Sequence, residues 1–445
     1  MKIQRSIGTL ALVFIMYFNT SGGPFTTETL VRDVGPGLAL LLLAIVPIVW
    51  SLPEVLIVGE LASMLPEEGG YYRWVQRAFG NFWAFQNGWI TWMYSLVDMA
   101  LYPILFNQYL RYFFPTLSHS AQWFVSLCVI WGATAINLRG AGRVGRSSIF
   151  AGIFVVVVFL LLAAASLPHA LHAPWVPFMA PGERVSQGLA VGLSTSIWNY
   201  SGWDNASTVQ GEVRDASRAY PRALSMALPL VALGYFVPLL ATLSASDWRT
   251  WTEGGWPQIA IASAGALGPI LAVLVALAGM ISALSLFNAL LLAYSRIPFV
   301  LAADGFLPPR LGATDTRGTP RNAVLAAAVV YSVFVLIPFG QLVIADVLLY
   351  SFALMMEFGA LITLRKREPE LRGAFRIPLG RGGVIALASV PMLVLVAVIG
   401  ISFADGEYGL PAVLGALIAA AMGVAAYWVA KRSGHHPSSR IGSVE

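Results

Sequence analysis

The sequence predicts an all-α polytopic membrane protein with about twelve transmembrane helices. The chain of 445 residues is 58% hydrophobic and only 11% charged, whereas a soluble domain carries roughly 25% charged residues. Its apolar residues form continuous runs, not the alternating pattern of a membrane barrel, and a spanning helix needs about 20 of them. The runs lie near residues 6–32, 37–64, 80–111, 118–137, 147–168, 186–212, 223–244, 265–296, 322–338, 341–364, 384–403 and 408–431.

The basic residues predict how the chain is oriented in the membrane. If the amino terminus lies inside, 23 of the 27 Lys and Arg fall in inner segments. Cytoplasmic connections carry such an excess, so we expect both termini to be cytoplasmic in the cell membrane. The +5 net charge therefore indicates topology and not nucleic-acid binding. The single cysteine, Cys128, lies inside a span, so no disulfide-linked partner chain is expected.

The first span is interrupted near its middle by a glycine–glycine–proline sequence. Pro24 has no N–H group and clashes with the carbonyl four residues earlier, while Gly22 and Gly23 let the backbone unwind. Unpaired backbone groups in hydrocarbon cost several kcal/mol each, so such a break is tolerated where it lines a cavity. A helix kink that packs closely against a neighbour is the alternative.

The two ends of this break suit different ligand groups. Carbonyls freed near Thr20 and Ser21 carry partial negative charge and suit an ammonium group. The N–H groups of the half-helix that begins near Phe25 suit a carboxylate. Glu28 lies one turn further out.

Ionisable side chains inside spans are costly and are functional candidates by default. Asp98 lies deep in the third span, and Asp346 and Glu357 lie in the tenth. The alternative for Asp98 is a purely structural pairing with a neighbouring backbone group or asparagine. Glu54 and Glu60 lie in the second span.

A second polar interruption lies in the sixth span. Residues 198–206 combine polar side chains, a glycine and two tryptophans, although no proline is present. We expect Tyr200, Ser201, Gly202 and Trp203 to contribute to a binding site, and Asp204 to pair with freed backbone or to cap the inner half-helix.

The positions of the two interruptions predict an inverted repeat. They fall five spans apart, and the first span runs outward whereas the sixth runs inward, as expected of a five-plus-five arrangement with two broken helices at its centre. We therefore expect a first five-helix repeat over residues 1–168 and a second, inverted one over 186–368. Two peripheral transmembrane helices over 372–433 and a disordered cytoplasmic tail over 434–445 follow.

Two hydroxyls in the eighth span are candidates for an ion or proton path. Ser282 and Ser285 lie among apolar residues. The alternative is that each hydroxyl bonds the carbonyl four residues earlier in its own helix.

Over essentially its whole length, the chain resembles the amino acid–polyamine–organocation superfamily of secondary transporters. Within it, the chain is most similar to the branch of plant-type polyamine and L-type amino acid uptake proteins. The segments that carry the resemblance are Ser21-Gly22-Gly23-Pro24, Gly202-Trp203-Asp204-Asn205, Gly211-Glu212-Val213, Tyr220-Pro221-Arg222, Ser295-Arg296, Asp304-Gly305-Phe306-Leu307-Pro308 and Gly318-Thr319-Pro320, and for the branch Pro66-Glu67-Glu68-Gly69-Gly70-Tyr71, Asp98-Met99-Ala100-Leu101-Tyr102-Pro103 and Trp203-Asp204-Asn205-Ala206-Ser207-Thr208.

The resemblance implies the five-plus-five fold, alternating access and a central site between the broken helices. Many members are driven by protons, and others exchange substrates. Related proton-coupled bacterial members carry a lysine in the fifth span, which this chain lacks, so the residue that carries the proton is not identified. The eighth span also lacks the acidic, polar stretch of the plant branch, which weakens the case for a polyamine.

We therefore predict a secondary active transporter of amino acids, coupled to protons or working by exchange, with polyamine uptake as the alternative. A channel or a non-transporting sensor would be a different class of protein. An enzyme is not expected, because every His lies at the end of a span, in a loop or in the tail, and not deep in the membrane where a serine protease would need one. No cofactor or metal is expected. Expected substrate-binding residues are Thr20, Ser21, Gly22, Gly23, Phe25, Asp98, Tyr200, Ser201, Gly202 and Trp203, and coupling candidates are Glu28, Asp98, Asp204, Ser282 and Ser285.

Overall fold

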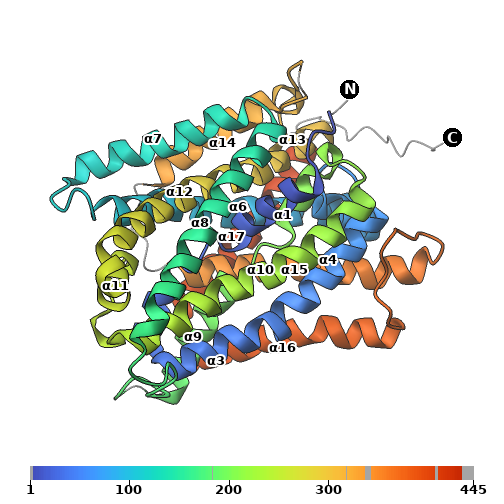
Figure 1. The fold of residues 1–445 in the computed structure, drawn as a ribbon. Coiled ribbons are helices and arrows are strands. Elements are labelled where there is room, and N and C mark those ends of the chain that lie inside the picture. The colour runs from blue at the N-terminus through green and yellow to red at the C-terminus, as the bar shows by residue number, and fades with distance from the viewer. Residues whose placement is uncertain (1–3, 183, 317, 336–341, 406–408, 433–445) are drawn as a thin grey trace.

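The computed structural model describes residues 4–182, 184–316, 318–335, 342–405 and 409–432, and within them it is helical without strands (Figure 1). The predicted tail over 434–445 lies outside this part. The α-helices are α1 (Thr9–Thr20), α2 (Thr27–Val34), α3 (Pro36–Val46), α4 (Leu52–Met64), α5 (Tyr71–Phe79), α6 (Asn81–Leu110), α7 (His119–Asn137), α8 (Ala141–Ser166), α9 (Val185–Asn199), α10 (Ala216–Ala245), α11 (Trp256–Ser263), α12 (Gly268–Tyr294), α13 (Arg296–Ala303), α14 (Arg321–Phe334), α15 (Leu342–Arg367), α16 (Arg381–Asp405) and α17 (Gly409–Arg432).

The predicted polytopic all-α fold is confirmed. Each of the apolar runs contains helix. Within the described residues, eight helices are long and apolar enough to cross a membrane, and α1 and α14 are shorter apolar helices. The main boundary difference is at α10, which begins at Ala216 and not near residue 223, because its first turns include the basic segment around Arg218.

Both predicted helix breaks are present. The first separates α1 from α2, and Gly22 and Gly23 there have φ of 68° and 121°. The second follows α9, where Gly202 has φ of 103° and the chain continues as a 3-10 helix over Asn205–Glu212. Positive φ at glycine lets the chain leave the helix without the steric cost that a side chain would add. The sequence contains no proline at the second break, so glycine conformation accounts for it.

The two breaks meet in the middle of the molecule. A Cβ atom built on Gly202 would lie 2.5 Å from the backbone oxygen of Asn19. The second span also bulges here, because a π-helical turn over Pro47–Ser51 joins α3 to α4, and the Ser51 hydroxyl donates to the Tyr200 carbonyl at 3.2 Å. A π-turn displaces one residue from the regular helix, which here supplies a partner for a freed carbonyl.

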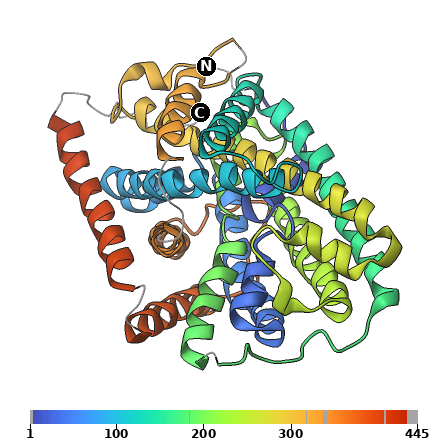
Figure 2. The same ribbon diagram turned by 90° about the vertical axis from the view of Figure 1, so that its left-hand side faces the viewer.

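Helices from distant parts of the chain surround the breaks. α12 packs against α6 and α8, α1 against α10 and α8, and α15 against α6. α16 and α17 lie at the edge of the molecule (Figure 2), where α17 packs on α6 and α15.

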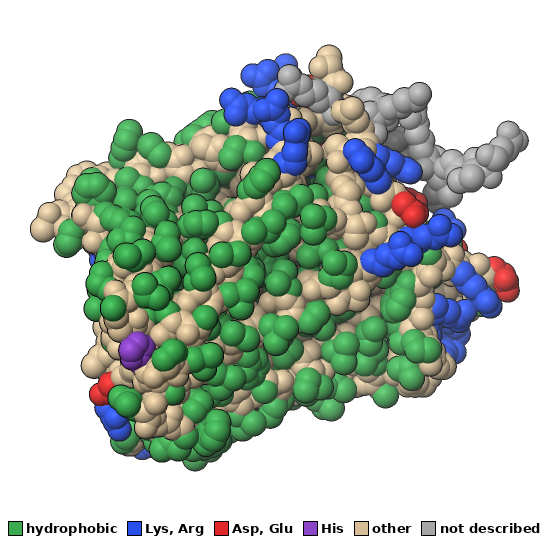
Figure 3. All heavy atoms as spheres, in the orientation of Figure 1, with side chains coloured by type: hydrophobic (Ala, Val, Ile, Leu, Met, Phe, Trp, Pro, Cys, Tyr) green, Lys and Arg blue, Asp and Glu red, His purple; other side chains and the backbone are tan. Residues whose placement is uncertain are grey.

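The surface matches a protein surrounded by lipid. Apolar side chains cover the flank in Figure 3, and Lys and Arg gather at one end, near α13 and the connection from α15 to α16. At this end the backbone amides of Ser6 and Ile7 both donate to the Glu212 carbonyl, and the Arg214 amide donates to the Ile7 carbonyl. The chain before α1 is therefore bound directly to the end of the broken sixth span.

Candidate solute site between the two helix breaks

A polar cavity lies between the two breaks. It is enclosed by both broken spans together with α6, α12 and α15. Its lining residues are Asn19, Thr20, Ser21, Phe25, Thr26, Tyr94, Asp98, Tyr102, Leu105, Trp198, Asn199, Ser201, Gly202, Asn205, Leu286, Tyr294, Val347 and Tyr350.

Asp98 is the acidic residue of this lining. Its carboxylate accepts hydrogen bonds from the hydroxyls of Tyr102, at 2.6 Å, and Tyr294, at 2.9 Å. Tyr102 is one helical turn further along α6, whereas Tyr294 reaches in from the end of α12. None of the described residues that line the cavity is Lys, Arg or His. The cavity therefore has a fixed negative group and no side-chain cation to neutralise it.

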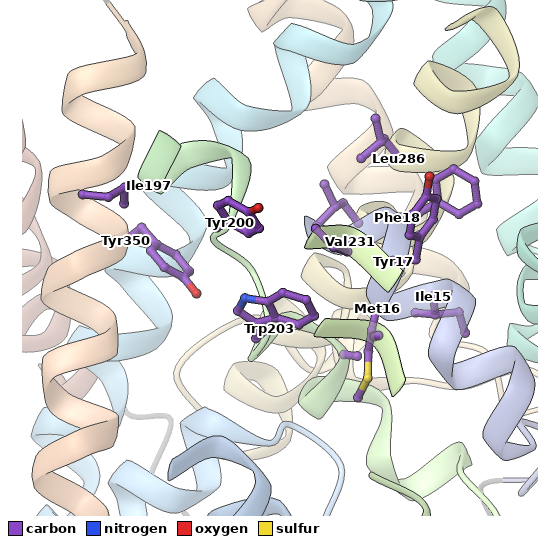
Figure 4. Close-up of a cluster of buried hydrophobic side chains, with 14 of the residues drawn as sticks. Ile15, Met16, Tyr17, Phe18, Ile197, Tyr200, Trp203, Val231, Leu286 and Tyr350 are labelled. Carbon is purple, nitrogen blue, oxygen red and sulfur yellow. The ribbon is translucent and has the colours of Figure 1, made fainter. Parts of the chain in front are cut away.

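Tyr350 connects the cavity to acids behind its wall. Its hydroxyl oxygen lies 2.5 Å from Glu54 Oε1 and 2.8 Å from Asp204 Oδ1, and it accepts the Gly202 amide at 2.9 Å. Figure 4 shows Tyr350 extending from α15 toward the second break, where Trp203 lies. The Trp203 amide donates to Glu54 Oε1 at 3.2 Å. Side-chain oxygens thus already hold the freed amides of Gly202 and Trp203.

The first break has its own polar partners. The Ser21 hydroxyl accepts the Gly23 amide at 3.1 Å, and the Ser282 hydroxyl donates to the Gly22 carbonyl at 2.6 Å. Thr26, which has φ of 76°, donates its hydroxyl to the Asn199 side chain across to the second span. Ser282 thus bonds the broken span and not the carbonyl four residues earlier in its own helix, and its role in an ion or proton path stays a prediction.

The structure brings some of the predicted site residues together and places others behind the cavity wall. Tyr200 packs edge-to-face on Tyr235 and donates its hydroxyl to the Leu43 carbonyl. Trp203 is fully buried and does not line the cavity. Gly22 and Gly23 likewise shape the break without lining the space. Predicted residues that do line it are Thr20, Ser21, Phe25, Asp98, Ser201 and Gly202.

The remaining coupling candidates lie away from this lining. Glu28 is buried in the first turn of α2, where its Oε1 accepts the Gly254 amide at 3.0 Å and the Tyr109 hydroxyl at 3.3 Å. Ser285 is buried on α12. Asp204 does not line the cavity, but its carboxylate is bonded to the Tyr350 hydroxyl, which does.

Sequence reasoning missed the tyrosines of the site. Tyr94, Asp98 and Tyr102 occur at four-residue spacing, which places them on one face of α6. That spacing is readable in the sequence. Tyr294 and Tyr350 carry no such local signal, since their place beside Asp98 and Gly202 follows from how α12 and α15 pack.

A polar cavity between two interrupted spans of a polytopic helical protein defines a membrane transporter. The family model described as amino acid permease matches residues 7–426, and the chain belongs to that family of transporters. The family predicted from sequence is thereby confirmed.

Relatives of two kinds match the chain. It is 35% identical over 398 residues to the polyamine transporter PUT1 of Oryza sativa subsp. japonica, covering 89% of this chain and 73% of that protein. It is 34% identical over 398 residues to the polyamine transporter RMV1 of Arabidopsis thaliana, covering 89% and 80%. Similarity is lower, at 24% over 338 residues, to the aromatic amino acid transport protein AroP of Escherichia coli strain K12, covering 70% and 69%.

Proposed function

We propose that this protein carries a diamine or polyamine across the cell membrane by alternating access. The observation that carries the proposal is the charge of the cavity. Asp98 faces a space that no described Lys, Arg or His lines, and four tyrosine hydroxyls and three asparagine amides supply further oxygens. An ammonium group donates hydrogen bonds and accepts none, so this lining matches it.

The second break supports the same choice. In an amino acid site, freed amides at a helix break receive the carboxylate of the cargo. Here the Gly202 amide is bonded to Tyr350 and the Trp203 amide to Glu54. A cargo without a carboxylate needs neither amide, and the relatives at 34–35% identity are named as polyamine transporters.

An amino acid is the second candidate. Phe25 and Thr26 line the cavity at the N-terminal end of α2, whose helix dipole favours an anion. A carboxylate there and an ammonium at Asp98 would fit a zwitterion. This arrangement supports the amino acid cargo expected from the sequence.

We further propose the membrane arrangement predicted from the sequence. Residues 1–168 and 186–368 form the two inverted repeats, and the basic end is cytoplasmic with both termini. The gathering of Lys and Arg in Figure 3 supports this orientation. At that end Arg296 pairs with Glu212 and Glu68, which supports an inner gate that is closed in this conformation.

Uptake into proteoliposomes tests the proposal. Purified protein is reconstituted, and entry of labelled putrescine, spermidine and a set of amino acids is measured with and without a pH gradient. We expect saturable putrescine entry that spermidine inhibits and neutral amino acids do not. Entry of amino acids alone would favour the second candidate, and entry of neither class would refute the proposal.

A further inference from the structure

We propose that three buried carboxyl groups behind the cavity, those of Glu54, Asp204 and Glu357, form one shared proton-binding site that couples transport to the proton gradient. The proposal rests on the transport function above and names the coupling site. The three groups come from α4, the second break and α15, and all are at most 1% exposed.

Counting hydrogens around Tyr350 gives the first argument. Its hydroxyl lies within hydrogen-bond distance of both Glu54 and Asp204, and it already accepts the Gly202 amide. A phenol has one hydrogen to donate. If it donates to one carboxylate, the other acid must supply its own hydrogen, because two acceptors facing each other repel. At least one of the two acids therefore carries a proton in this arrangement.

Glu357 gives the second argument. Its side chain is fully buried and close enough to Asp204 and Glu54 to interact with them electrostatically. Neither of its oxygens makes a hydrogen bond of ordinary geometry to the described residues. An ionised carboxylate held in this way costs several kcal/mol, whereas its neutral form has a hydrogen to offer to Asp204. A buried carboxyl without a hydrogen-bond partner among the described residues, beside two other acids, is a place for a proton to reside.

No ion pair joins a Lys, Arg or His of the described residues to Glu54, Asp204 or Glu357. The phenols of Tyr71, Tyr220 and Tyr350, which belong to α5, α10 and α15, interact electrostatically with the acids. The buried arginines of the inner half have other partners. They are Arg296 with Glu212 and Glu68, and Arg365 with Glu60. Three ionised carboxylates at one site without a cation repel strongly, so protons must be shared among them.

The cluster is joined to the part of the protein that must move. Glu54 and Tyr350 are the acceptors that hold the Trp203 and Gly202 amides of the second break, and Tyr350 also lines the cavity. Loss of a proton changes which oxygens can accept and which must donate. Proton release and rearrangement of the break are therefore one event, and the site needs no lysine in the fifth span.

Isosteric neutral variants test this inference in the full-length protein. Glu357→Gln, Asp204→Asn and Glu54→Gln are compared with Glu253→Gln, which alters an exposed acid bonded to Gln108 near the outer end. Accumulation of putrescine driven by a pH gradient is measured beside putrescine counterflow, which needs no net proton movement. We expect Glu357→Gln to lower gradient-driven accumulation by about tenfold or more while counterflow stays within about threefold of the parent. Glu253→Gln should change neither.

A second measurement does not depend on cargo. Infrared spectra of the purified protein at neutral pH should contain the carbonyl stretch of protonated carboxylic acid, and each of the three cluster variants should reduce it. Absence of that band in the parent, or gradient-driven accumulation retained in all three variants, overturns the inference, as does accumulation that follows a sodium gradient instead. If no diamine moves in any assay but the band behaves as expected, the proposed cargo fails and the proton site stands.

Discussion

Replacing Asp98 by asparagine tests the role of the cavity's fixed charge most directly. Asparagine has nearly the same shape, and its amide can still bond the hydroxyls of Tyr102 and Tyr294, one as acceptor and one as donor. The fold should therefore persist. What is lost is the attraction between the carboxylate and an ammonium group of the cargo.

The size of this loss follows from the geometry. A hydrogen bond to a charged group contributes about 1.5–3 kcal/mol, and about 1.4 kcal/mol corresponds to a tenfold change in binding. Asp98→Asn should therefore raise the putrescine concentration for half-maximal counterflow by about ten- to a hundredfold. Tyr102→Phe is the matched control, since it removes one hydroxyl at Asp98 and leaves the charge. Its effect should be several times smaller.

The assay is putrescine counterflow in proteoliposomes, with thermal unfolding of the same preparations followed by intrinsic fluorescence. An Asp98→Asn protein that unfolds near the parent temperature and binds putrescine within threefold of the parent would refute the assignment. A similar loss for Tyr102→Phe would show that the hydroxyl network matters and the charge does not.

Three further predictions concern the stability of the protein around the site. Burial and the neighbouring Glu212 carboxylate raise the pKa of Glu68, in the connection between α4 and α5, from 4.5 to about 8. Between these two pH values the folded state holds a proton that the unfolded chain releases. The contribution of Glu68 to stability therefore falls as pH rises from about 4.5 to 8. The difference in Tm between the parent and Glu68→Gln should change with pH across that window and nowhere else. Gly202→Ala should destabilise the folded protein by about 2 kcal/mol or more, because φ is 103° and a Cβ would meet the Asn19 carbonyl. The control Gly80→Ala, with φ of 88° and nothing within 4 Å of the added Cβ, should cost about 1 kcal/mol. Equal shifts in Tm for the two variants would contradict the close contact at Gly202. Arg365→Gln should destabilise the folded protein by about 3–5 kcal/mol, since it leaves Glu60 buried without its cation. The double variant with Glu60→Gln should recover part of that loss. An additive double-mutant cycle would show that the pair does not interact.

The sequence was sufficient for features that depend on local chemistry. Long apolar runs predicted the spans, and the glycines and Pro24 predicted the first break, because a proline in hydrocarbon has few structural solutions. Asp98 stood out because acids in a span are costly. These arguments need no knowledge of which helices touch.

Features that depend on packing between distant segments were not readable. Tyr350 lies 148 residues from Gly202 in the chain, yet its hydroxyl is the acceptor for that amide. Ser282 bonds the carbonyl of Gly22, 260 residues away. Each side chain alone is ordinary for a membrane helix, and its partner is fixed only when α15 and α12 are placed beside the breaks.

The backbone bonds that join Ser6 and Ile7 to Glu212, and Arg214 to Ile7, have a mechanical consequence. Moving α1 without the end of the sixth span would break all three bonds at once. The start of the first span and the end of the sixth should therefore move together as one rigid unit. A disulfide engineered between positions 7 and 213 should then leave the transport cycle running. A disulfide that instead joins this unit to one of the helices packed around it should stop the transport cycle.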